Sequence, residues 1–209
     1  MMRKIHLILA ASIFILAAAF NVNHTSGYKI GDKASDFSLK NVDGNMVSLA
    51  DYKNAKGFIV IFTCNHCPFS QAYEKRIIEL HQKYESKGYP VIAINPNDKD
   101  REPEDSYENM QKLAKEKSYP FVYLYDETQE IAKAYGATRT PHVFILQKSK
   151  KGNLVKYIGA IDDNYEDATA AQQKYVEQAV DALLAGKSIS INQTKAIGCG
   201  IKWKKKPTE

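Results

Sequence analysis

A C-x-x-C motif, Cys64–Cys67, directly follows an apolar run and directly precedes a segment with helical periodicity. The apolar run, residues 57–63, predicts a buried strand, and residues 67–87 place apolar side chains on one helical face. A cysteine at such a junction lies beside the free backbone N–H groups of a helix N-terminus, which favour its thiolate. The motif therefore predicts a redox centre in which Cys64 and Cys67 cycle between dithiol and disulfide.

The remaining patterns predict an α/β fold. Asp43–Gly44 separates two short segments of strand character, which is a strong signal for a β-hairpin. Further strands are expected at 91–95 and 121–125, helices at 106–117, 131–135 and 165–185, and a second hairpin joining 142–146 to 154–158. Strands that alternate with helices and end in a hairpin and a helix are typical of an α/β sandwich with a mixed sheet.

This order, with the Thr140–Pro141 pair just before the second hairpin, resembles the thioredoxin fold. The resemblance implies a three-layer α/β/α sandwich with a mixed central sheet and, here, an N-terminal β-hairpin extension. Residues 31–44 resemble the opening of the AhpC/TSA and TlpA-like branches. The segments Cys64-Asn65-His66-Cys67-Pro68-Phe69 and Ile197-Gly198-Cys199-Gly200-Ile201-Lys202-Trp203 resemble a peroxiredoxin-like thioredoxin subfamily, and the similarity extends over about residues 30–203.

The chain departs from the thioredoxin pattern at three positions. Thr63 stands where thioredoxins usually carry a Trp, and apolar residues such as Phe58 stand where they carry a buried Asp. The buried proton acceptor is therefore either missing or supplied from elsewhere. Arg139 replaces a Cys that relatives in the narrower subfamily often carry before the Thr-Pro pair.

Cys64 is the expected nucleophile, with a pKa lowered by the helix N-terminus and lowered further by His66 whenever that imidazole is cationic. Cys67 would be the resolving thiol, which attacks the mixed disulfide and releases the reduced partner. A His at this position resembles protein disulfide isomerase and the periplasmic dithiol oxidases, and it implies a more oxidising centre than that of thioredoxin. His66 could also be a plain surface residue in a turn.

The resemblance also implies a substrate groove beside the C-x-x-C motif. Pro141 would be a cis-proline, Thr140 would offer backbone atoms to an extended substrate, and Arg139 would border the groove as a thiolate-stabilising or merely a surface charge. Cys199 is a possible third redox thiol, a mixed-disulfide handle or an inert residue. Asp162–Asp163 either lies at the edge of the site or caps the last helix.

The N-terminus predicts an export signal. Arg3 and Lys4 precede the apolar stretch 5–20, which is shorter than a membrane-spanning helix requires. We expect a signal peptide at 1–20 (cleaved, or retained as an anchor), a flexible lead-in at 21–28, a thioredoxin-like domain at 29–187, and a C-terminal basic tail carrying Cys199 at 188–209. The basic cluster 202–206 within this tail is expected to be solvated rather than to touch a membrane surface or nucleic acid. The protein would then act in the periplasm or another extracytoplasmic compartment, where disulfides persist.

The sequence thus predicts an exported thiol–disulfide oxidoreductase without cofactor or metal. Its partners would be disulfide- or thiol-bearing proteins and a redox partner protein, with no nucleic acid, and a membrane only if the leader is uncleaved. One alternative is a thiol-dependent peroxidase, although neither cysteine fits the P-x-x-x-[ST]-x-x-C arrangement of peroxiredoxins. Another is a Cu(I) chaperone, with two thiolates and a nitrogen from His66 or His142.

Overall fold

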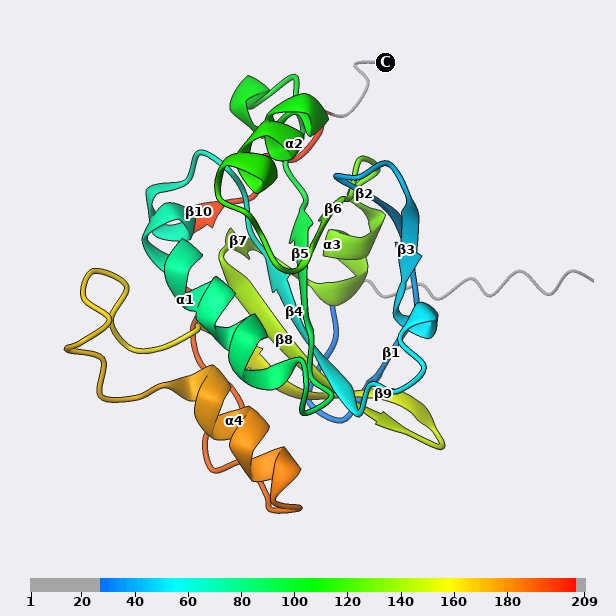
Figure 1. Cartoon of the computed structure of the whole chain (residues 1–209), viewed down its shortest axis with the longest axis vertical. Coiled ribbons are helices and arrows are strands. Elements are labelled where there is room, and N and C mark those ends of the chain that lie inside the picture. Colours follow the sequence, from blue (N-terminus) through cyan, green and yellow to red (C-terminus); the bar gives the residue numbers. More distant parts are fainter. Residues whose placement is uncertain (1–26, 206–209) are drawn as a thin grey trace, which may run out of the picture.

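The computed structural model describes residues 27–205, which form three layers around one mixed sheet (Figure 1). The eight strands of this sheet follow the order β1-β9-β8-β4-β5-β6-β2-β3, and β10 pairs with β7 in a separate two-stranded sheet. The strands are β1 (Lys33–Ala34), β2 (Ser38–Asn41), β3 (Met46–Ser48), β4 (Gly57–Phe62), β5 (Val91–Asn95), β6 (Val122–Tyr125), β7 (Arg139–Thr140), β8 (His142–Ser149), β9 (Gly152–Gly159) and β10 (Cys199–Gly200).

Helices cover both faces of the sheet (Figure 1). Helices α1, α2 and α4 pack on one face, and α3 packs on the other. They are α1 (Pro68–Tyr84), α2 (Tyr107–Glu116), α3 (Glu130–Tyr135) and α4 (Tyr175–Leu184), with short 3-10 turns η1 (Leu49–Asp51) and η2 (Pro103–Asp105). The predicted α/β sandwich of the thioredoxin type is therefore confirmed.

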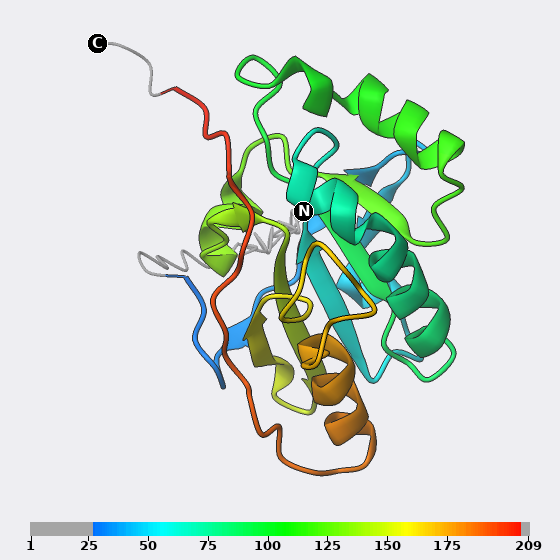
Figure 2. The ribbon, with the colours of Figure 1, turned by 90° about the vertical axis from the view of Figure 1, so that its left-hand side faces the viewer.

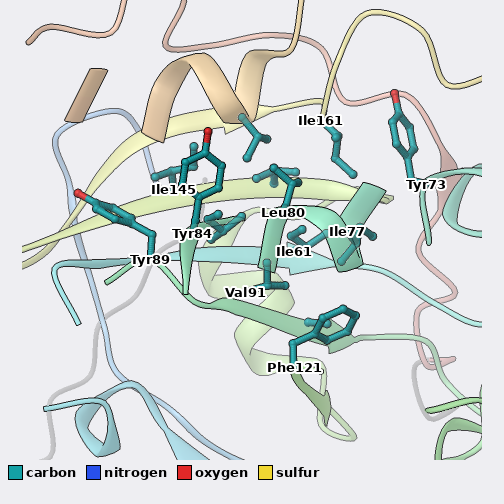
Figure 3. Packing of buried hydrophobic residues seen from close by; sticks show 14 of the residues in the cluster. Ile61, Tyr73, Ile77, Leu80, Tyr84, Tyr89, Val91, Phe121, Ile145 and Ile161 are labelled. Atoms are coloured by element: carbon teal, nitrogen blue, oxygen red, sulfur yellow. The ribbon is translucent and has the colours of Figure 1, made fainter. Parts of the chain in front are cut away.

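The alternation of side chains along each strand builds two hydrophobic cores. In β4, Ile59 and Ile61 face α1, whereas Phe58, Val60 and Phe62 face α3, and all five are fully buried. The larger core also receives Ile77 and Leu80 from α1 (Figure 3). Because both faces are covered, the central strands are continuous apolar runs rather than alternating ones, which is the pattern of buried parallel strands.

The two predicted hairpins are confirmed. Strands β2 and β3 pair antiparallel around Asp43–Gly44, and Gly44 adopts a positive φ of 91° in that turn. This hairpin extends the sheet because β2 also pairs antiparallel with β6. Strands β8 and β9 form the second hairpin, and β4, β5 and β6 run parallel to one another between the two hairpins.

The last helix is shorter than predicted. It begins at Tyr175 rather than near Tyr165, because polar side chains in the preceding segment bond to the backbone in turns. Asn164 accepts hydrogen bonds from the N–H groups of Glu166 and Asp167, and Asp167 accepts one from Thr169. Such local side-chain bonds compete with helix formation.

The C-terminal segment, residues 188–205, packs against the domain over much of its length, whereas Lys204 and Lys205 of the expected solvated cluster are exposed. It runs from the end of α4 along the molecule and reaches the end of the sheet where α1 begins (Figure 2). Thr194 bonds to β9 and to Ala160, β10 pairs with β7, and Ile201 is buried in the core on the α3 side. We call residues 188–205 the tail.

The expected signal peptide at 1–20 and most of the lead-in at 21–28 lie outside the described residues. Within residues 27–205, no helix combines the length and the apolar character needed to cross a membrane.

Candidate active site

The C-x-x-C motif lies where the sequence places it, between a central strand and a helix. Strand β4 ends at Phe62, Cys67 is the N-cap residue of α1, and Pro68 is the first residue of the helix. Proline is well suited to this position because its missing N–H would have no partner inside the helix. Cys64 therefore lies in the short loop over the N-terminus of α1.

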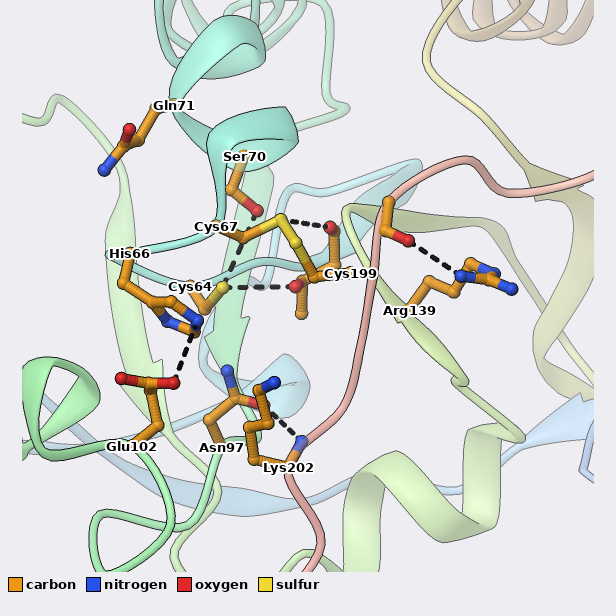
Figure 4. Close-up of a disulfide and its surroundings, with 12 residues drawn as sticks. Cys64, His66, Cys67, Ser70, Gln71, Asn97, Glu102, Arg139, Cys199 and Lys202 are labelled. Carbon is orange, nitrogen blue, oxygen red and sulfur yellow. Dashed lines mark hydrogen bonds and ion pairs between the residues drawn. A yellow bond between two sulfur atoms is a disulfide. The ribbon is translucent and has the colours of Figure 1, made fainter.

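The disulfide of this structure joins Cys67 to Cys199 of the tail, 132 residues away (Figure 4). Cys64 is the free cysteine. This differs from the expected Cys64–Cys67 pair, and the reason is the tail: the antiparallel pairing of β10 with β7 sets Cys199 opposite Thr140. The carbonyl oxygen of Thr140 in turn lies 3.2 Å from the sulfur of Cys67.

The thiol of Cys64 is enclosed by polar side chains and is only 5% exposed. Its sulfur lies 3.1 Å from the hydroxyl oxygen of Thr140 and 3.8 Å from that of Ser70. Burial, and secondarily the negative charge of Asp105, raise the pKa of Cys64 to about 11, and the hydrogen bonds from Thr140, the Cys67 backbone and Ser70 only partly oppose this. The expectation of a lowered pKa for Cys64 is therefore wrong in this state of the protein, because burial of the thiol and the nearby charge of Asp105 outweigh the groups that favour the thiolate.

The contacts of His66 argue against the alternative that it is a plain surface residue. Its Nδ1 lies 2.7 Å from Oδ2 of Asp105, and its Nε2 lies 3.1 Å from Oε2 of Glu102. Figure 4 shows the imidazole between Cys64 and Glu102. The two carboxylates fix the ring in position beside the Cys64 loop.

Asp105 is a residue of the site that the sequence analysis did not identify. It is fully buried, and its carboxylate accepts hydrogen bonds from the backbone N–H of Asn65 (2.6 Å) and from the side-chain amide of Asn97 (2.6 Å). It supplies the buried carboxylate that β4 lacks, but from η2, about 40 residues beyond the motif. In the sequence, Asp105 was recognisable only as an acidic residue directly before Ser106, where a helix was predicted to begin.

Thr140 lies against both sulfurs of the motif, and its peptide bond to Pro141 is cis, as predicted. Thr140 is fully buried beneath the tail. Arg139 is exposed and donates a hydrogen bond from Nη1 to the carbonyl oxygen of Gly198 (2.8 Å). Arg139 therefore holds the tail in this structure, and its hydrogen bond is with the tail rather than with a sulfur.

A metal ion would find one group of possible donors here. Cys64, His66 and Asp105 bring donor atoms within 4.8 Å of one another. The predicted pair of thiolates is not available, because Cys67 is bonded to Cys199. His142, the other candidate nitrogen ligand, accepts a hydrogen bond from the N–H of Thr138 and is not in this group.

Asp162 belongs to a separate structural cluster. It accepts hydrogen bonds from the hydroxyl of Tyr73 (2.7 Å) and from the guanidinium of Arg76 (2.6 Å), both on α1. It does not cap α4, which begins at Tyr175. Asp163 accepts a hydrogen bond from the N–H of Gln172 in the turn before that helix. Asp162 therefore attaches the 160–165 loop to α1.

Comparison with known proteins agrees with this description. Residues 30–157 match the family model described as AhpC/TSA family. The chain is 28% identical over 145 residues to the thiol-disulfide oxidoreductase ResA of Geobacillus thermodenitrificans, covering 69% of this chain and 78% of that protein. It is also 28% identical over 109 residues to the putative peroxiredoxin bcp of Helicobacter pylori, covering 52% of this chain and 66% of that protein.

Solved structures add the fold. An uncharacterised conserved protein from Geobacillus kaustophilus is 42% identical, with a TM-score of 0.78 over 87% of this chain and 94% of that one. A putative thiol:disulfide interchange protein DsbE from Chlorobium tepidum is 21% identical, with a TM-score of 0.57 over 75% of this chain and 98% of that one, and supports the thioredoxin-like fold alone. The predicted fold is confirmed, and so is the enzyme class, thiol–disulfide oxidoreductase, which the ResA similarity bears out.

Proposed function

The chain belongs to the AhpC/TSA family, and from that premise we propose that it is an exported enzyme that exchanges disulfides with thiol- or disulfide-bearing proteins through Cys64 and Cys67. One observation carries this proposal: both sulfurs of the motif contact Thr140, the residue before the cis-proline, at 3.1 Å and 3.2 Å. Two sulfurs held at one backbone position can be bonded, released and bonded again with little movement of the scaffold.

The reaction needs a thiolate, and the residues around Cys64 control when one forms. Thr140 and Ser70 donate hydrogen bonds that favour the thiolate, whereas burial and the charge of Asp105 disfavour it. The Asp105–His66 pair lies within reach of the thiol, because the donor atoms of the three residues are within 4.8 Å of one another. We assign to this pair the transfer of the Cys64 proton, with Glu102 holding the second nitrogen of the ring.

In the forward direction, which starts from the protein with Cys64 and Cys67 both reduced, the Cys64 thiolate attacks a disulfide of the partner protein. A mixed disulfide forms, the partner's first sulfur leaves as a thiolate, and Cys67 then attacks Cys64 to release the second. The partner is reduced by two electrons, and the Cys64–Cys67 pair is oxidised by two. The reverse sequence oxidises a partner dithiol.

Export is supported by the sequence features at residues 3–20 and by the disulfide itself. A bond between two cysteines 132 residues apart persists in oxidising compartments and is rare in the cytosol. Fractionation of the native cells, with N-terminal sequencing of the mature protein, tests this part. Recovery of an uncleaved, cytosolic chain would overturn it.

The exchange activity is tested by equilibrating the purified full chain with glutathione buffers and trapping the thiols. A reduction potential of about −180 mV or above marks an oxidase or isomerase, and one of about −270 mV marks a reductant. Turnover of a peptide disulfide should fall to the uncatalysed rate in Cys64→Ser. Equal turnover in Cys64→Ser and the unchanged protein would overturn the proposal.

A thiol peroxidase is the second candidate, favoured by the similarity to bcp. It requires Cys64 to reduce hydrogen peroxide and to pass through a sulfenic acid. Peroxide consumption with a thiol reductant tests it, and a rate no higher than that of Cys64→Ser excludes it.

A further inference from the structure

The tail reaches the site as an added strand. In β10, Cys199 pairs in register with Thr140 and Gly200 pairs with Arg139, antiparallel to β7. Just beyond it, the N–H of Ile201 bonds to the carbonyl oxygen of Thr138 at 3.3 Å. An extended segment that pairs with an open strand edge in this way has the geometry of peptide recognition by strand addition.

The close approach of this strand requires glycine. A Cβ atom on Gly198 would lie 2.2 Å from the carbonyl oxygen of Thr140, closer than any side chain tolerates. Gly200, on the same strand, has no atom within 4 Å of the position of a Cβ. The space beside Thr140 therefore accepts only glycine at the position directly before the cysteine. At the position directly after the cysteine, there is room for a side chain.

Backbone contacts anchor the following residues. The N–H of Lys202 bonds to Oδ1 of Asn97 (2.8 Å), and its carbonyl oxygen accepts from the N–H of Asp98 (3.0 Å) and from the side chain of Gln129 (2.8 Å). The N–H of Lys204 bonds to Oε1 of Gln129 (2.7 Å). The main chain of the tail is thus held on both sides, while the side chain of Ile201 enters the core.

We propose that residues 197–203 are a tethered substrate strand: they take the place of a partner protein's strand beside Thr140, and the bond of Cys199 to the resolving Cys67 keeps the site closed to other proteins until that bond is exchanged. This inference rests on the proposed function. With the tail in place, Thr140 and Cys67 are fully buried and Cys64 is 5% exposed, so no other strand can reach them.

Opening needs no external oxidant or reductant. The Cys64 thiolate attacks the sulfur of Cys67, a Cys64–Cys67 disulfide forms, and the Cys67–Cys199 bond breaks. The electron pair of the broken bond leaves on Cys199, which takes up the proton that Cys64 gives away. The count of disulfides is unchanged, and the tail is now free to leave the groove.

The tail also defines the class of partner that replaces it. The partner is an extended protein segment that carries a cysteine, a glycine immediately before it and an apolar residue two positions after it, as in Gly198-Cys199-Gly200-Ile201. The glycine is required by the carbonyl of Thr140, and the apolar residue by the buried position of Ile201.

The test uses the oxidised full chain, Gly198→Ala, its matched control Gly200→Ala, and Cys199→Ser. Disulfides are mapped by mass spectrometry, and the rate at which iodoacetamide alkylates Cys199, the thiol that opening releases, is measured at a fixed alkaline pH. We expect a Cys67–Cys199 bond in the unchanged protein. The alkylation rate in Gly200→Ala should equal that of the unchanged protein. The rate should rise roughly tenfold or more in Gly198→Ala, because overpacking shifts the local opening of the tail. Oxidised Cys199→Ser should instead contain a Cys64–Cys67 disulfide, and neither cysteine of its motif should be alkylated.

Two results would overturn the proposal: an unchanged oxidised protein bonded through Cys64 and Cys67 alone, or equal alkylation rates of Cys199 in Gly198→Ala and Gly200→Ala. If Gly198→Ala does not fold, Arg139→Ala, which removes the hydrogen bond to the carbonyl oxygen of Gly198, gives the same decision. These readouts do not depend on turnover, so they separate the two proposals. Exchange activity that persists in Cys199→Ser but is lost in Cys64→Ser supports the enzyme function whatever the tail does. A peptide copied from residues 196–203 should exchange more slowly with Cys199→Ser when alanine replaces the glycine that corresponds to Gly198. A rate equal to that of the unchanged peptide would contradict the partner class.

Discussion

The sulfur of Cys64 lies 3.1 Å from the hydroxyl of Thr140, a residue 76 positions further along the chain. The same residue contacts Cys67 through its carbonyl oxygen. Thr140 thus serves the two sulfurs with two different groups: its hydroxyl stabilises the Cys64 thiolate, whereas its backbone lines the strand position that Cys199 occupies.

Replacing Thr140 by Val should raise the pKa of Cys64 above its value of about 11, because the hydroxyl that stabilises the thiolate is lost. Alkylation of Cys64 at a pH below that pKa should slow roughly two- to tenfold, which is the worth of one hydrogen bond. Thr140→Ser keeps the hydroxyl and should react at the original rate. Equal slowing in both variants would show that packing, and not the hydrogen bond, is responsible.

Replacing Asp105 by Asn should lower the pKa of Cys64. The negative charge of Asp105 is the second cause of the raised value, after burial, and the amide removes the charge while keeping an acceptor for the Asn65 N–H. The ultraviolet absorbance of the thiolate, followed against pH in the oxidised protein, measures this shift. Glu104→Gln, an exposed carboxylate on the same turn, is the control. A pKa that rises in Asp105→Asn would contradict the assignment.

Replacing Asp162 by Ala should lower the free energy of unfolding by about 3 kcal/mol, because it leaves the buried Arg76 guanidinium without its carboxylate partner. The reduction potential should stay unchanged, because Asp162 contacts α1 and its own loop rather than a sulfur. Chemical denaturation and glutathione equilibration of the same variant measure the two quantities. A changed potential with unchanged stability would return Asp162 to the edge of the active site.

His142 should make the protein less stable in acid. Burial, and secondarily the charge of Arg139, lower its pKa from about 6.5 to about 4. The unfolded chain therefore binds a proton near pH 6.5 that the folded protein does not bind until about pH 4. Stability is full above pH 6.5 and falls through this window by about 3 kcal/mol in total.

His142→Asn keeps an acceptor for the Thr138 N–H and should lack this part of the pH dependence. Urea denaturation at pH 7 and pH 4.5 compares the two proteins. The prediction fails if both lose the same free energy between these pH values.

Local patterns predicted most of the fold. The apolar run of β4, the Asp43–Gly44 turn and the second hairpin all appear in the structure, because strand burial and turn chemistry are encoded by neighbouring residues. Helix α4 was predicted too long. The helical periodicity was extended to residues before Tyr175, where the side chains of Asn164 and Asp167 instead bond to the backbone in turns.

The sequence predicted only those parts of the site that neighbouring residues form. The positions of Cys64 and Cys67 follow from the motif and the cis-proline from the resemblance to the thioredoxin fold, whereas Asp105 comes from a loop that the motif does not specify. The direction of the Cys64 pKa shift was missed for a related reason. A helix N-terminus is visible in the sequence, but the burial that outweighs it depends on contacts between distant segments.

The loop between β5 and α2 contacts two parts of the molecule that have so far been treated separately. Asn97 and Asp98 bind the backbone of Lys202, and a few residues later Glu102 and Asp105 hold the ring of His66. Because one short segment carries both sets of contacts, we expect release of the tail to change the setting of the imidazole as well, and such a linkage would be reciprocal. The segment between β5 and α2 would then carry information in both directions between the groove and the proton acceptor beside Cys64.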